Sequence, residues 1–156
     1  MKTERIERVR AALRAQGLTQ MIVCDPKSVW YLTGVAVEPY ERLLALYLPI
    51  EGEPVLFLNR LFNIPNPPCK AVWHTDTDAP VAQIAATVDA EKPLGIDKEW
   101  PAKFLIPLME AHPAMKVVLA SDCVDDCRAC KDAEEQALMR EASRICLLYT
   151  SPSPRD

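Results

Sequence analysis

The segment His74-Thr75-Asp76-Thr77-Asp78 gathers an imidazole and two carboxylates within five residues. Such groups are common metal ligands. A hydrolytic centre with two metal ions, however, needs several bridging carboxylates from separate elements, and the sequence shows no such set around this segment. Carboxylates are also stabilised at the N-terminus of a helix by its dipole. The sequence therefore predicts that Asp76 and Asp78 cap a helix running from Pro80 to about Ala90.

Cys123, Cys127 and Cys130 follow the spacing Cys-x3-Cys-x2-Cys, which three thiolates use when they hold an iron–sulfur cluster. The same spacing places three side chains on one face of a helix. A structural zinc site would lack its fourth ligand in this neighbourhood. We therefore predict that these cysteines are small packing residues that face the sheet, and that all six cysteines of the chain are reduced thiols.

Other catalytic signatures are missing from the sequence. Ser28 has no glycine elbow around it, and four unclustered glycines exclude a phosphate-binding loop. His112 lies in a proline-bounded turn, which predicts a position facing solvent. The pair Trp30-Tyr31 could stack on a ligand, but two aromatic residues on a short helix more often belong to a core. We predict no catalytic residue, no metal ligand and no bound cofactor in this chain.

Composition limits the remaining classes of function. A chain of 156 residues, 49% of them hydrophobic, fits one α/β domain with a core. The net charge of −4, without a dense run of Lys or Arg, argues against nucleic acid as a partner. No apolar run reaches the ~20 residues that a membrane span requires, and the charged N-terminus does not look like a signal peptide. We therefore expect a cytoplasmic protein that contacts no membrane.

The apolar runs predict one mixed sheet. A helix over 4–16 precedes a buried strand at 20–24, and strands at 43–49 and 54–59 form an antiparallel hairpin around Gly52. Two strand–helix units and a sixth strand at 116–120 follow. This order of elements predicts an α/β fold, with a six-stranded mixed sheet flanked by helices on both faces.

A long exit helix is predicted from Asp122 to Ile145, because the segment is rich in helix-forming Ala, Glu, Met and Arg. The run Leu147-Leu148-Tyr149-Thr150 and the Ser/Pro-rich end break this pattern. We expect that they do not continue the helix. They resemble a translated sequencing adapter, although a native linker has similar composition. The expected organisation is a domain at 1–121, a linker helix at 122–145 and a non-native tail at 146–156.

Read in order, several segments resemble the N-terminal domain of the creatinase/prolidase family of pita-bread metallopeptidases, which includes Xaa-Pro aminopeptidases and dipeptidases. The stretch most similar to the family is Asp25-Pro26-Lys27-Ser28-Val29-Trp30-Tyr31-Leu32-Thr33-Gly34. The remaining matches are Arg5–Arg10, Gly17-Leu18, Met21–Val23, Glu41-Arg42-Leu43, Glu51–Phe57, Leu94–Asp97, Lys131–Glu135 and Leu138–Ala142. The cysteines at 127 and 130 depart from the apolar residues usual there.

The resemblance implies a ribonuclease H-like N-terminal domain whose catalytic partner is absent. In the family the two divalent metal ions, Mn, Co or Zn, are bound by two Asp, one His and two Glu of a C-terminal domain. The N-terminal domain contributes to a homodimer and covers the partner's active site. The residues that the resemblance assigns to this interface or capping surface are Asp25, Ser28, Trp30, Tyr31, Thr33, Gly34 and Arg42.

The expected function is that of a non-catalytic domain of a metal-dependent Xaa-Pro peptidase. Two alternatives remain, namely the N-terminal domain of a creatinase-like amidinohydrolase and a stand-alone α/β binding or scaffold domain. If the exit helix lacks a domain that it normally meets, apolar residues in its second half should be exposed and should promote association. These residues are Leu138, Met139, Ala142 and Ile145.

Overall fold

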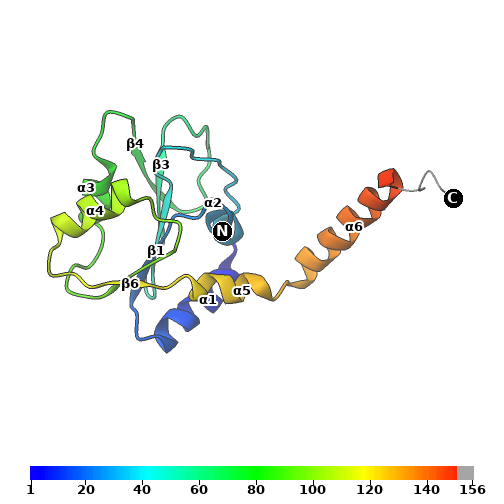
Figure 1. The fold of residues 1–156 in the computed structure, drawn as a ribbon, viewed down its shortest axis with the longest axis horizontal. Coiled ribbons are helices and arrows are strands. Elements are labelled where there is room, and N and C mark those ends of the chain that lie inside the picture. The colour runs from blue at the N-terminus through cyan, green and yellow to red at the C-terminus, as the bar shows by residue number, and fades with distance from the viewer. Residues whose placement is uncertain (151–156) are drawn as a thin grey trace.

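The structure, a computed structural model, describes residues 1–150, with the side chains of residues 1–148. Its centre is a sheet in the order β4-β3-β2-β1-β5-β6 (Figure 1). The strands are β1 (Gln20–Val23), β2 (Ala45–Pro49), β3 (Val55–Asn59), β4 (Lys70–His74), β5 (Leu94–Ile96) and β6 (Val117–Leu119). The predicted six-stranded sheet is therefore confirmed.

The sheet is mixed, as the order of elements predicts. Strand β2 pairs antiparallel with both β1 and β3, whereas the β3–β4, β1–β5 and β5–β6 pairs are parallel. The β2–β3 hairpin turns at Gly52, whose φ of 90° is a conformation that side chains with a Cβ rarely adopt. The predicted hairpin is thus correct, and it places β3 next to β2, with β4 beyond it at the edge of the sheet.

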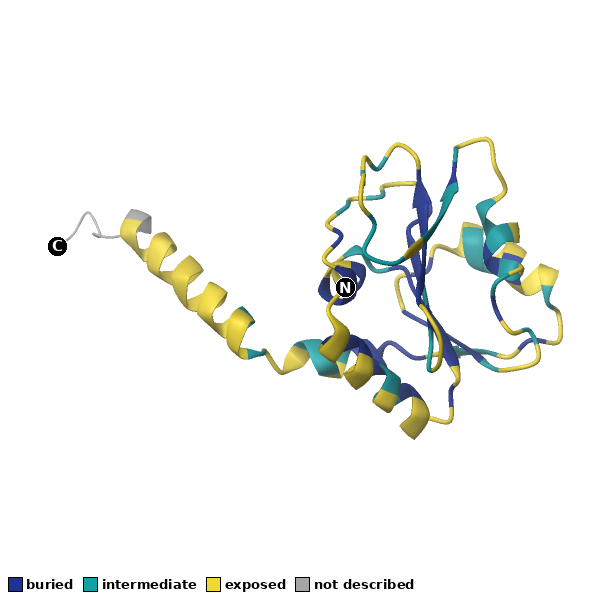
Figure 2. Ribbon diagram, turned by 180° about the vertical axis from the view of Figure 1, so that it is seen from behind, coloured by how far each residue is buried: buried dark blue, intermediate teal, exposed yellow. Residues whose placement is uncertain are grey.

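Successive side chains of each strand point to opposite faces of the sheet, and helices cover both faces. Leu46 and Leu56 pack in one core with α1 (Thr3–Ala15), α2 (Pro26–Thr33) and α5 (Asp122–Ala129). Ala45 and Phe57, one residue along each strand, pack in a second core with α3 (Pro80–Ala85) and α4 (Ala102–Ala111). Figure 2 shows the buried strands enclosed between these helical layers.

The exit helix differs from its prediction in two ways. It is divided into α5 and α6 (Ala133–Thr150), because Cys130 adopts an extended conformation with φ −91° and ψ 102°. In addition, α6 continues through Leu147 and Leu148, so the expectation that these residues cannot extend a helix was wrong. The Ser/Pro-rich end at 151–156 lies outside the described residues. Helix α3 is also shorter than predicted, since it ends at Ala85.

Helix α6 projects away from the sheet, and its side chains from Gln136 to Leu148 are exposed (Figures 1 and 2). Leu138 is 64% exposed, Met139 55% and Ile145 45%, and Ala142 is exposed as well. The predicted apolar surface on the second half of the exit helix is therefore confirmed. None of the helices in residues 1–150 is long and apolar enough to cross a membrane.

A matched pair of leucine substitutions tests the placement of the core. Leu58 in β3 is fully buried, whereas Leu61, just after the same strand, is 67% exposed. We expect Leu58→Ala to lower the free energy of unfolding by about 2–5 kcal/mol, because it leaves a cavity in the core. Leu61→Ala should change it by less than about 0.5 kcal/mol. Urea denaturation measures both, and equal losses would contradict this assignment of the core.

Candidate functional site

Helix α2 carries most of the residues assigned to a capping or interface surface, and Asp25 sets its start. The Asp25 carboxylate accepts hydrogen bonds from the backbone N–H of Lys27 at 3.3 Å and of Ser28 at 3.0 Å. Pro26 occupies the first turn, where a missing N–H costs nothing. Gly34 ends the helix in the left-handed conformation, with φ 81°. Local sequence therefore fixes both ends of α2.

The Asp25 carboxylate also links α2 to α5. Its Oδ2 accepts a hydrogen bond from Ser28 Oγ at 2.7 Å and forms an ion pair with Arg128 Nη1 at 2.9 Å. Arg128 Nη1 also donates to Ser28 Oγ at 2.9 Å. Burial alone would raise the pKa of Asp25, but the hydrogen bonds from Ser28 and Lys27 and the charge of Arg128 hold it below its ordinary value. The ionised Asp25 carboxylate therefore helps to hold α2 against α5.

Tyr31 and Thr33 are internal residues of this segment. Tyr31 is 5% exposed, accepts a hydrogen bond from Arg8 Nη2 at 2.9 Å and donates to the Cys127 carbonyl at 3.1 Å. Thr33 Oγ1 donates to the Val29 carbonyl at 2.6 Å. Trp30, in contrast, is 58% exposed. The interpretation of the aromatic pair as core is thus correct for Tyr31 and wrong for Trp30.

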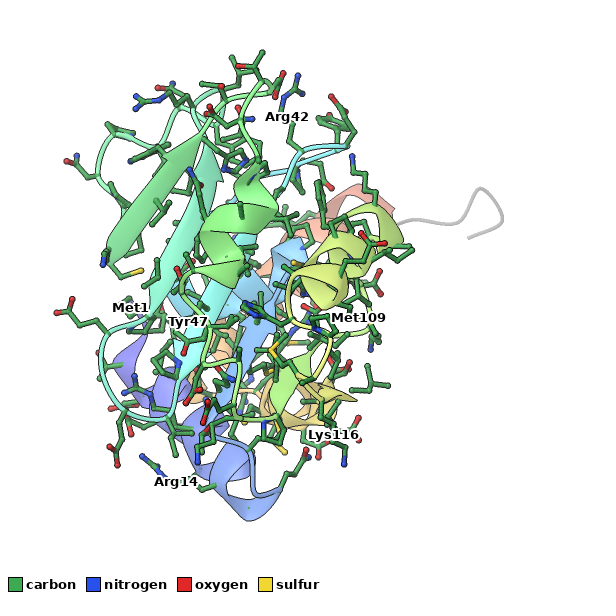
Figure 3. All side chains as sticks on the ribbon, turned by 90° about the vertical axis from the view of Figure 1, so that its left-hand side faces the viewer. Met1, Arg14, Arg42, Tyr47, Met109 and Lys116 are labelled. Atoms are coloured by element: carbon green, nitrogen blue, oxygen red, sulfur yellow. The ribbon has the colours of Figure 1, made fainter. Side chains whose placement is uncertain are left out.

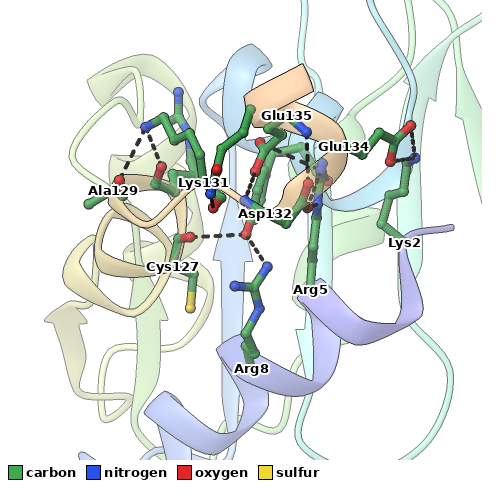
Figure 4. A network of polar contacts seen from close by, with 12 residues as sticks. Lys2, Arg5, Arg8, Cys127, Ala129, Lys131, Asp132, Glu134 and Glu135 are labelled. Atoms are coloured by element: carbon green, nitrogen blue, oxygen red, sulfur yellow. Dashed lines mark hydrogen bonds and ion pairs between the residues drawn. The ribbon is translucent and has the colours of Figure 1, made fainter. Parts of the chain in front are cut away.

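A cluster of charges around Arg5 holds the start of α6 (Figure 4). Asp132 and Glu135 form a reciprocal capping box, in which the Glu135 N–H donates to Asp132 Oδ1 at 2.9 Å and the Asp132 N–H donates to Glu135 Oε2 at 3.0 Å. Arg5 Nη2 lies 2.7 Å from Asp132 Oδ2 and 3.5 Å from Glu135 Oε1. Lys2 adds an ion pair with Glu134 at 3.2 Å.

Arg5 is the central residue of this cluster, and its side chain is 10% exposed. Its guanidinium also donates to the Tyr31 carbonyl at 3.2 Å and lies 4.4 Å from the centre of the Tyr31 ring. Burial alone would lower the pKa of Arg5, but the Asp132 hydrogen bond and the nearby charge of Glu135 raise it overall. One buried cation therefore joins α1, α2 and the start of α6.

A cavity of about 320 Å³ lies between α2 and the first turns of α6. Trp30, Gly34 and Leu138 line its apolar side, and Lys27 and Lys131 add positive charge at its wall. The Arg5 cluster directs α6 away from the domain, and this leaves the cavity between α2 and the start of α6. Three residues of the predicted capping surface, Trp30, Tyr31 and Gly34, therefore meet at one hollow.

Arg42, the remaining member of the predicted surface, lies at a separate place near the end of β4 (Figure 3). Its guanidinium binds both carboxylate oxygens of Asp76, through Nε at 3.0 Å and Nη2 at 2.9 Å. Asn59 Nδ2 donates to Asp76 Oδ1 at 2.8 Å. The hydrogen bond from Arg42 is the main reason that the pKa of Asp76 is lowered. Asp76 therefore holds Arg42 in a fixed, bidentate geometry.

The prediction that the acidic pair caps α3 was wrong. Asp76 is bound by Arg42 and Asn59, and Asp78 accepts from the backbone N–H of Thr75 at 2.6 Å and from its hydroxyl at 2.9 Å. Helix α3 has no side-chain cap. The proline at its first position removes one of the N–H groups that a cap would satisfy, and the turn before it uses Asp78 instead.

His74 and His112 do not extend these surfaces into a metal centre. His74 is 2% exposed, and burial lowers its pKa, so it is neutral near pH 7. His112, predicted to face solvent, is half-buried with its Nε2 2.9 Å from the Ala85 carbonyl. Among residues 1–150, no group of three or more His, Cys, Asp and Glu side chains could hold a metal ion. These residues do not fit the two-metal centre that the resemblance associates with the family.

The three cysteines at 123, 127 and 130 differ in burial. Cys123 is buried and Cys127 is partly buried against the same core, as predicted, whereas Cys130 is exposed because the helix ends there. Burial, together with the nearby Cys127, raises the pKa of Cys123 to about 11. Cys24, Cys69, Cys123, Cys127 and Cys130 form no disulfide. The packing interpretation holds for the first two members of the triplet and was wrong for Cys130.

Several residues of the site had no place in the sequence prediction. Arg5, Arg128 and Asn59 act through partners far away in the chain, so no local pattern reveals them. Asp132 and Glu135, however, carry a readable signal, because Asp-x-x-Glu before an apolar run is a capping box. That pattern would have placed the start of α6 correctly.

The family follows from comparison with known sequences. Residues 5–130 match the profile of the Creatinase/Prolidase N-terminal domain, which covers most of the chain. The chain therefore belongs to this family.

Its relatives are longer proteins. A protein of Mycobacterium tuberculosis named "Probable dipeptidase PepE" is 29% identical over an alignment 147 residues long, which covers 88% of this chain and 39% of the relative. The crystal structure of dipeptidase PepE from Mycobacterium ulcerans is similar with a TM-score of 0.74 at 27% identity, over 87% of this chain and 38% of that one. The chain thus spans about two-fifths of the relatives that it matches.

A prolidase from Thermococcus sibiricus shares the fold at 22% identity, with a TM-score of 0.83 over 94% of this chain and 42% of that chain. Residues 133–156 are 24 of the 156 residues, or about 15%, so a match over 94% includes part of α6. The projecting α6 therefore belongs to the fold that this chain shares with that longer protein.

The Arg5 cluster can be tested by removing its cation. Arg5→Ala removes the donor to the Tyr31 carbonyl and the cation that pairs with two carboxylates, so we expect the free energy of unfolding to fall by about 1–3 kcal/mol. Arg144→Ala removes an exposed pair with Glu141 and should cause no measurable change. Urea denaturation of both variants makes the comparison, and an equally small effect at Arg5 would contradict its anchoring role.

Asp25 makes a prediction about pH. Since its pKa in the folded protein is below the ordinary value of about 3.9, the ionised carboxylate stabilises the fold above that pH, and this contribution is lost as the pH falls through the folded pKa. Asp25→Asn should therefore destabilise the protein at pH 7, and the difference from wild type should shrink at pH 3. Urea midpoints of both proteins measure it. A difference of equal size at both pH values would show that the charge of Asp25 contributes nothing.

Proposed function

We propose that this chain is the non-catalytic N-terminal domain of a metal-dependent, cytoplasmic Xaa-Pro peptidase. The observation that carries the proposal is the combination of family membership with the span of about two-fifths of dipeptidase relatives. The names of these relatives favour a peptidase over a creatinase-like amidinohydrolase. Their greater length favours one domain of a larger enzyme over a stand-alone scaffold.

The chemistry is assigned to the part of the enzyme that this chain does not include. The described residues contain no group that could hold a metal ion, so the two divalent metal ions and their ligands would belong to a C-terminal domain. No step of hydrolysis is therefore derived from the residues of this chain. Its proposed contribution is to position that domain and to restrict access to it.

Helix α6 and the cavity at its start support the positioning role. Leu138 lines the cavity, and Met139 and Ile145 continue an exposed apolar surface along the helix. Exposed apolar surface of this kind is typical of a contact with another part of a protein. We assign the α6 surface to contact with the C-terminal domain, whose direction from this domain is set by the Arg5 cluster.

The capping role is assigned to the exposed members of the predicted surface. Trp30 and Arg42 present side chains at the surface, whereas Ser28, Tyr31 and Thr33 are buried and hold α2 in place. In a homodimer, the exposed pair would approach the active site of the partner subunit and would leave room for short peptides. Asp25 and Gly34 define the two ends of the helix between them.

A chimeric enzyme tests the proposal. Residues 1–145 of this chain would replace the corresponding segment of the mycobacterial dipeptidase PepE. With Mn²⁺ and an Xaa-Pro dipeptide, we expect the chimera to hydrolyse the substrate and the isolated 156-residue chain to show no turnover. The PepE segment that lacks any N-terminal domain provides the matched control.

Two results would contradict the proposal. Hydrolysis by the isolated chain would place a catalytic site within it. A chimera that folds and dimerises, but is no more active than the PepE segment alone, would show that this domain does not serve a peptidase of that type.

A further inference from the structure

A hollow of about 380 Å³, here called the β4 hollow, opens beside Arg42 where β4 ends (Figure 3). It lies near the starts of the two helices that cover this face of the sheet, since Pro80 begins α3 and Phe104 belongs to the first turn of α4. Its volume is within the range of about 300–1,000 Å³ that is typical of small-molecule sites. The proposed function assigns no ligand to this hollow, so its lining residues indicate what it could bind.

The buried ring of His74 points toward the β4 hollow. Val72, two residues earlier in β4, packs in the core under α3 and α4, so the side chain of His74 points to the same face of the sheet. His74 is 2% exposed, and within residues 1–150 neither its Nδ1 nor its Nε2 makes a hydrogen bond. Buried polar groups are nearly always hydrogen-bonded. A neutral imidazole offers one donor and one acceptor, so His74 can bind either kind of group of a ligand.

Asp78 supplies a negative charge to the wall of the hollow. Thr75 donates its backbone N–H and its hydroxyl to Asp78 Oδ2, at 2.6 Å and 2.9 Å, and in the part of the chain that the structure describes Oδ1 accepts no hydrogen bond. Burial lowers the pKa of His74 and the charges of Asp78 and Asp76 oppose this effect, which places both carboxylates near the ring. Asp76 is neutralised by Arg42 at 2.9 Å, whereas Asp78 belongs to no ion pair of the described residues.

Lys103 supplies a positive charge from the first turn of α4. Its ammonium group donates one hydrogen bond to the Glu41 carbonyl and lies 4.6 Å from the centre of the Phe104 ring. An ammonium group has three N–H donors, so two remain for a ligand. Phe104, together with Leu43 and Pro80, also gives the hollow an apolar wall. The β4 hollow thus combines an anion, a cation, an imidazole and apolar surface.

This lining fits a small molecule that carries both charges close together. Its ammonium group would donate to Asp78 Oδ1, its carboxylate would accept from Lys103, and either group can satisfy a nitrogen of His74. A ligand with a single charge would leave one of the two lining charges without a partner. We propose that the β4 hollow binds a free α-amino acid with an apolar side chain, which packs against Phe104. The inference goes beyond the proposed function, because it requires neither a C-terminal domain nor a metal ion.

Titration of the 156-residue chain with L-leucine, and with two analogues that each lack one charged group, tests the proposal. Isocaproate lacks the ammonium group of leucine, and isopentylamine lacks its carboxylate. We expect leucine to bind with a Kd on the order of 0.1–10 mM and each analogue to bind about tenfold more weakly. The ring-nitrogen NMR signals of His74 should shift with leucine. Those of His112, whose Nε2 already lies 2.9 Å from the Ala85 carbonyl, should not.

Two substitutions separate the roles of the charges. Asp78→Asn should weaken leucine about tenfold and should not weaken isocaproate, which has no ammonium group. Lys103→Gln should weaken leucine and isocaproate equally and should leave isopentylamine unchanged. Asp126→Asn and Lys116→Gln are matched controls at exposed positions outside the hollow, and both should bind leucine like the wild type. A variant that fails to fold would lose both analogues, so a selective loss shows that the fold is retained.

Four results would overturn the proposal. Leucine binds no more tightly than its two analogues, it leaves the His74 signals unchanged, or the control substitutions weaken it as much as Asp78→Asn and Lys103→Gln do. The fourth is tighter binding of glycyl-leucine than of leucine, because that result would assign the hollow to a peptide and not to a free amino acid.

Discussion

The buried guanidinium of Arg5 is the interaction on which the arrangement of this domain and its last helix depends. It satisfies the carbonyl and ring of Tyr31 on one side and the Asp132–Glu135 capping box on the other. Burying a charge is costly unless it is paired and hydrogen-bonded, and here the cation on α1 finds its partners on α2 and at the start of α6. The end of the sheet domain and the start of α6 therefore cannot be placed independently.

A second charge cluster repeats the principle on a smaller scale. Asp25 begins α2, and the same carboxylate binds Arg128 near the end of α5. The helices on this face of the sheet are thus joined by polar contacts at their ends and by the apolar core beneath them. On the other face, α3 and α4 pack around Phe57, Ile84 and Leu108, and His112 Nε2 at the end of α4 lies 2.9 Å from the Ala85 carbonyl at the end of α3.

The sequence was informative where structure is decided locally. Apolar runs bounded by turn residues specified the strands, and Gly52 specified the hairpin, because strand side-chain alternation and positive φ are local properties. The sequence was less informative where a side chain has both a local and a distant candidate partner. Asp76 could cap a helix or bind Arg42, which is 34 residues away, and the distant cation prevailed. Helix propensity likewise could not reveal the interruption at Cys130, because both flanking segments favour helix.

The family comparison completes what the residues alone left open. The segment from Asp25 to Gly34 is the stretch most similar to the family, yet much of it is internal and holds α2 in place. Trp30 is exposed on the helix that these internal residues hold in place. Arg42 is only partly exposed and is held separately, by Asp76.

The joint at Cys130–Asp132 gives α6 the properties of a lever. Its 18 residues span about 27 Å, so a rotation of 10° at the joint displaces the far end by about 5 Å. Small adjustments in the length of the Arg5–Asp132 contact are therefore magnified into displacements as large as the spacing between neighbouring strands. The direction of any segment that follows α6 therefore depends on the Arg5–Asp132 contact.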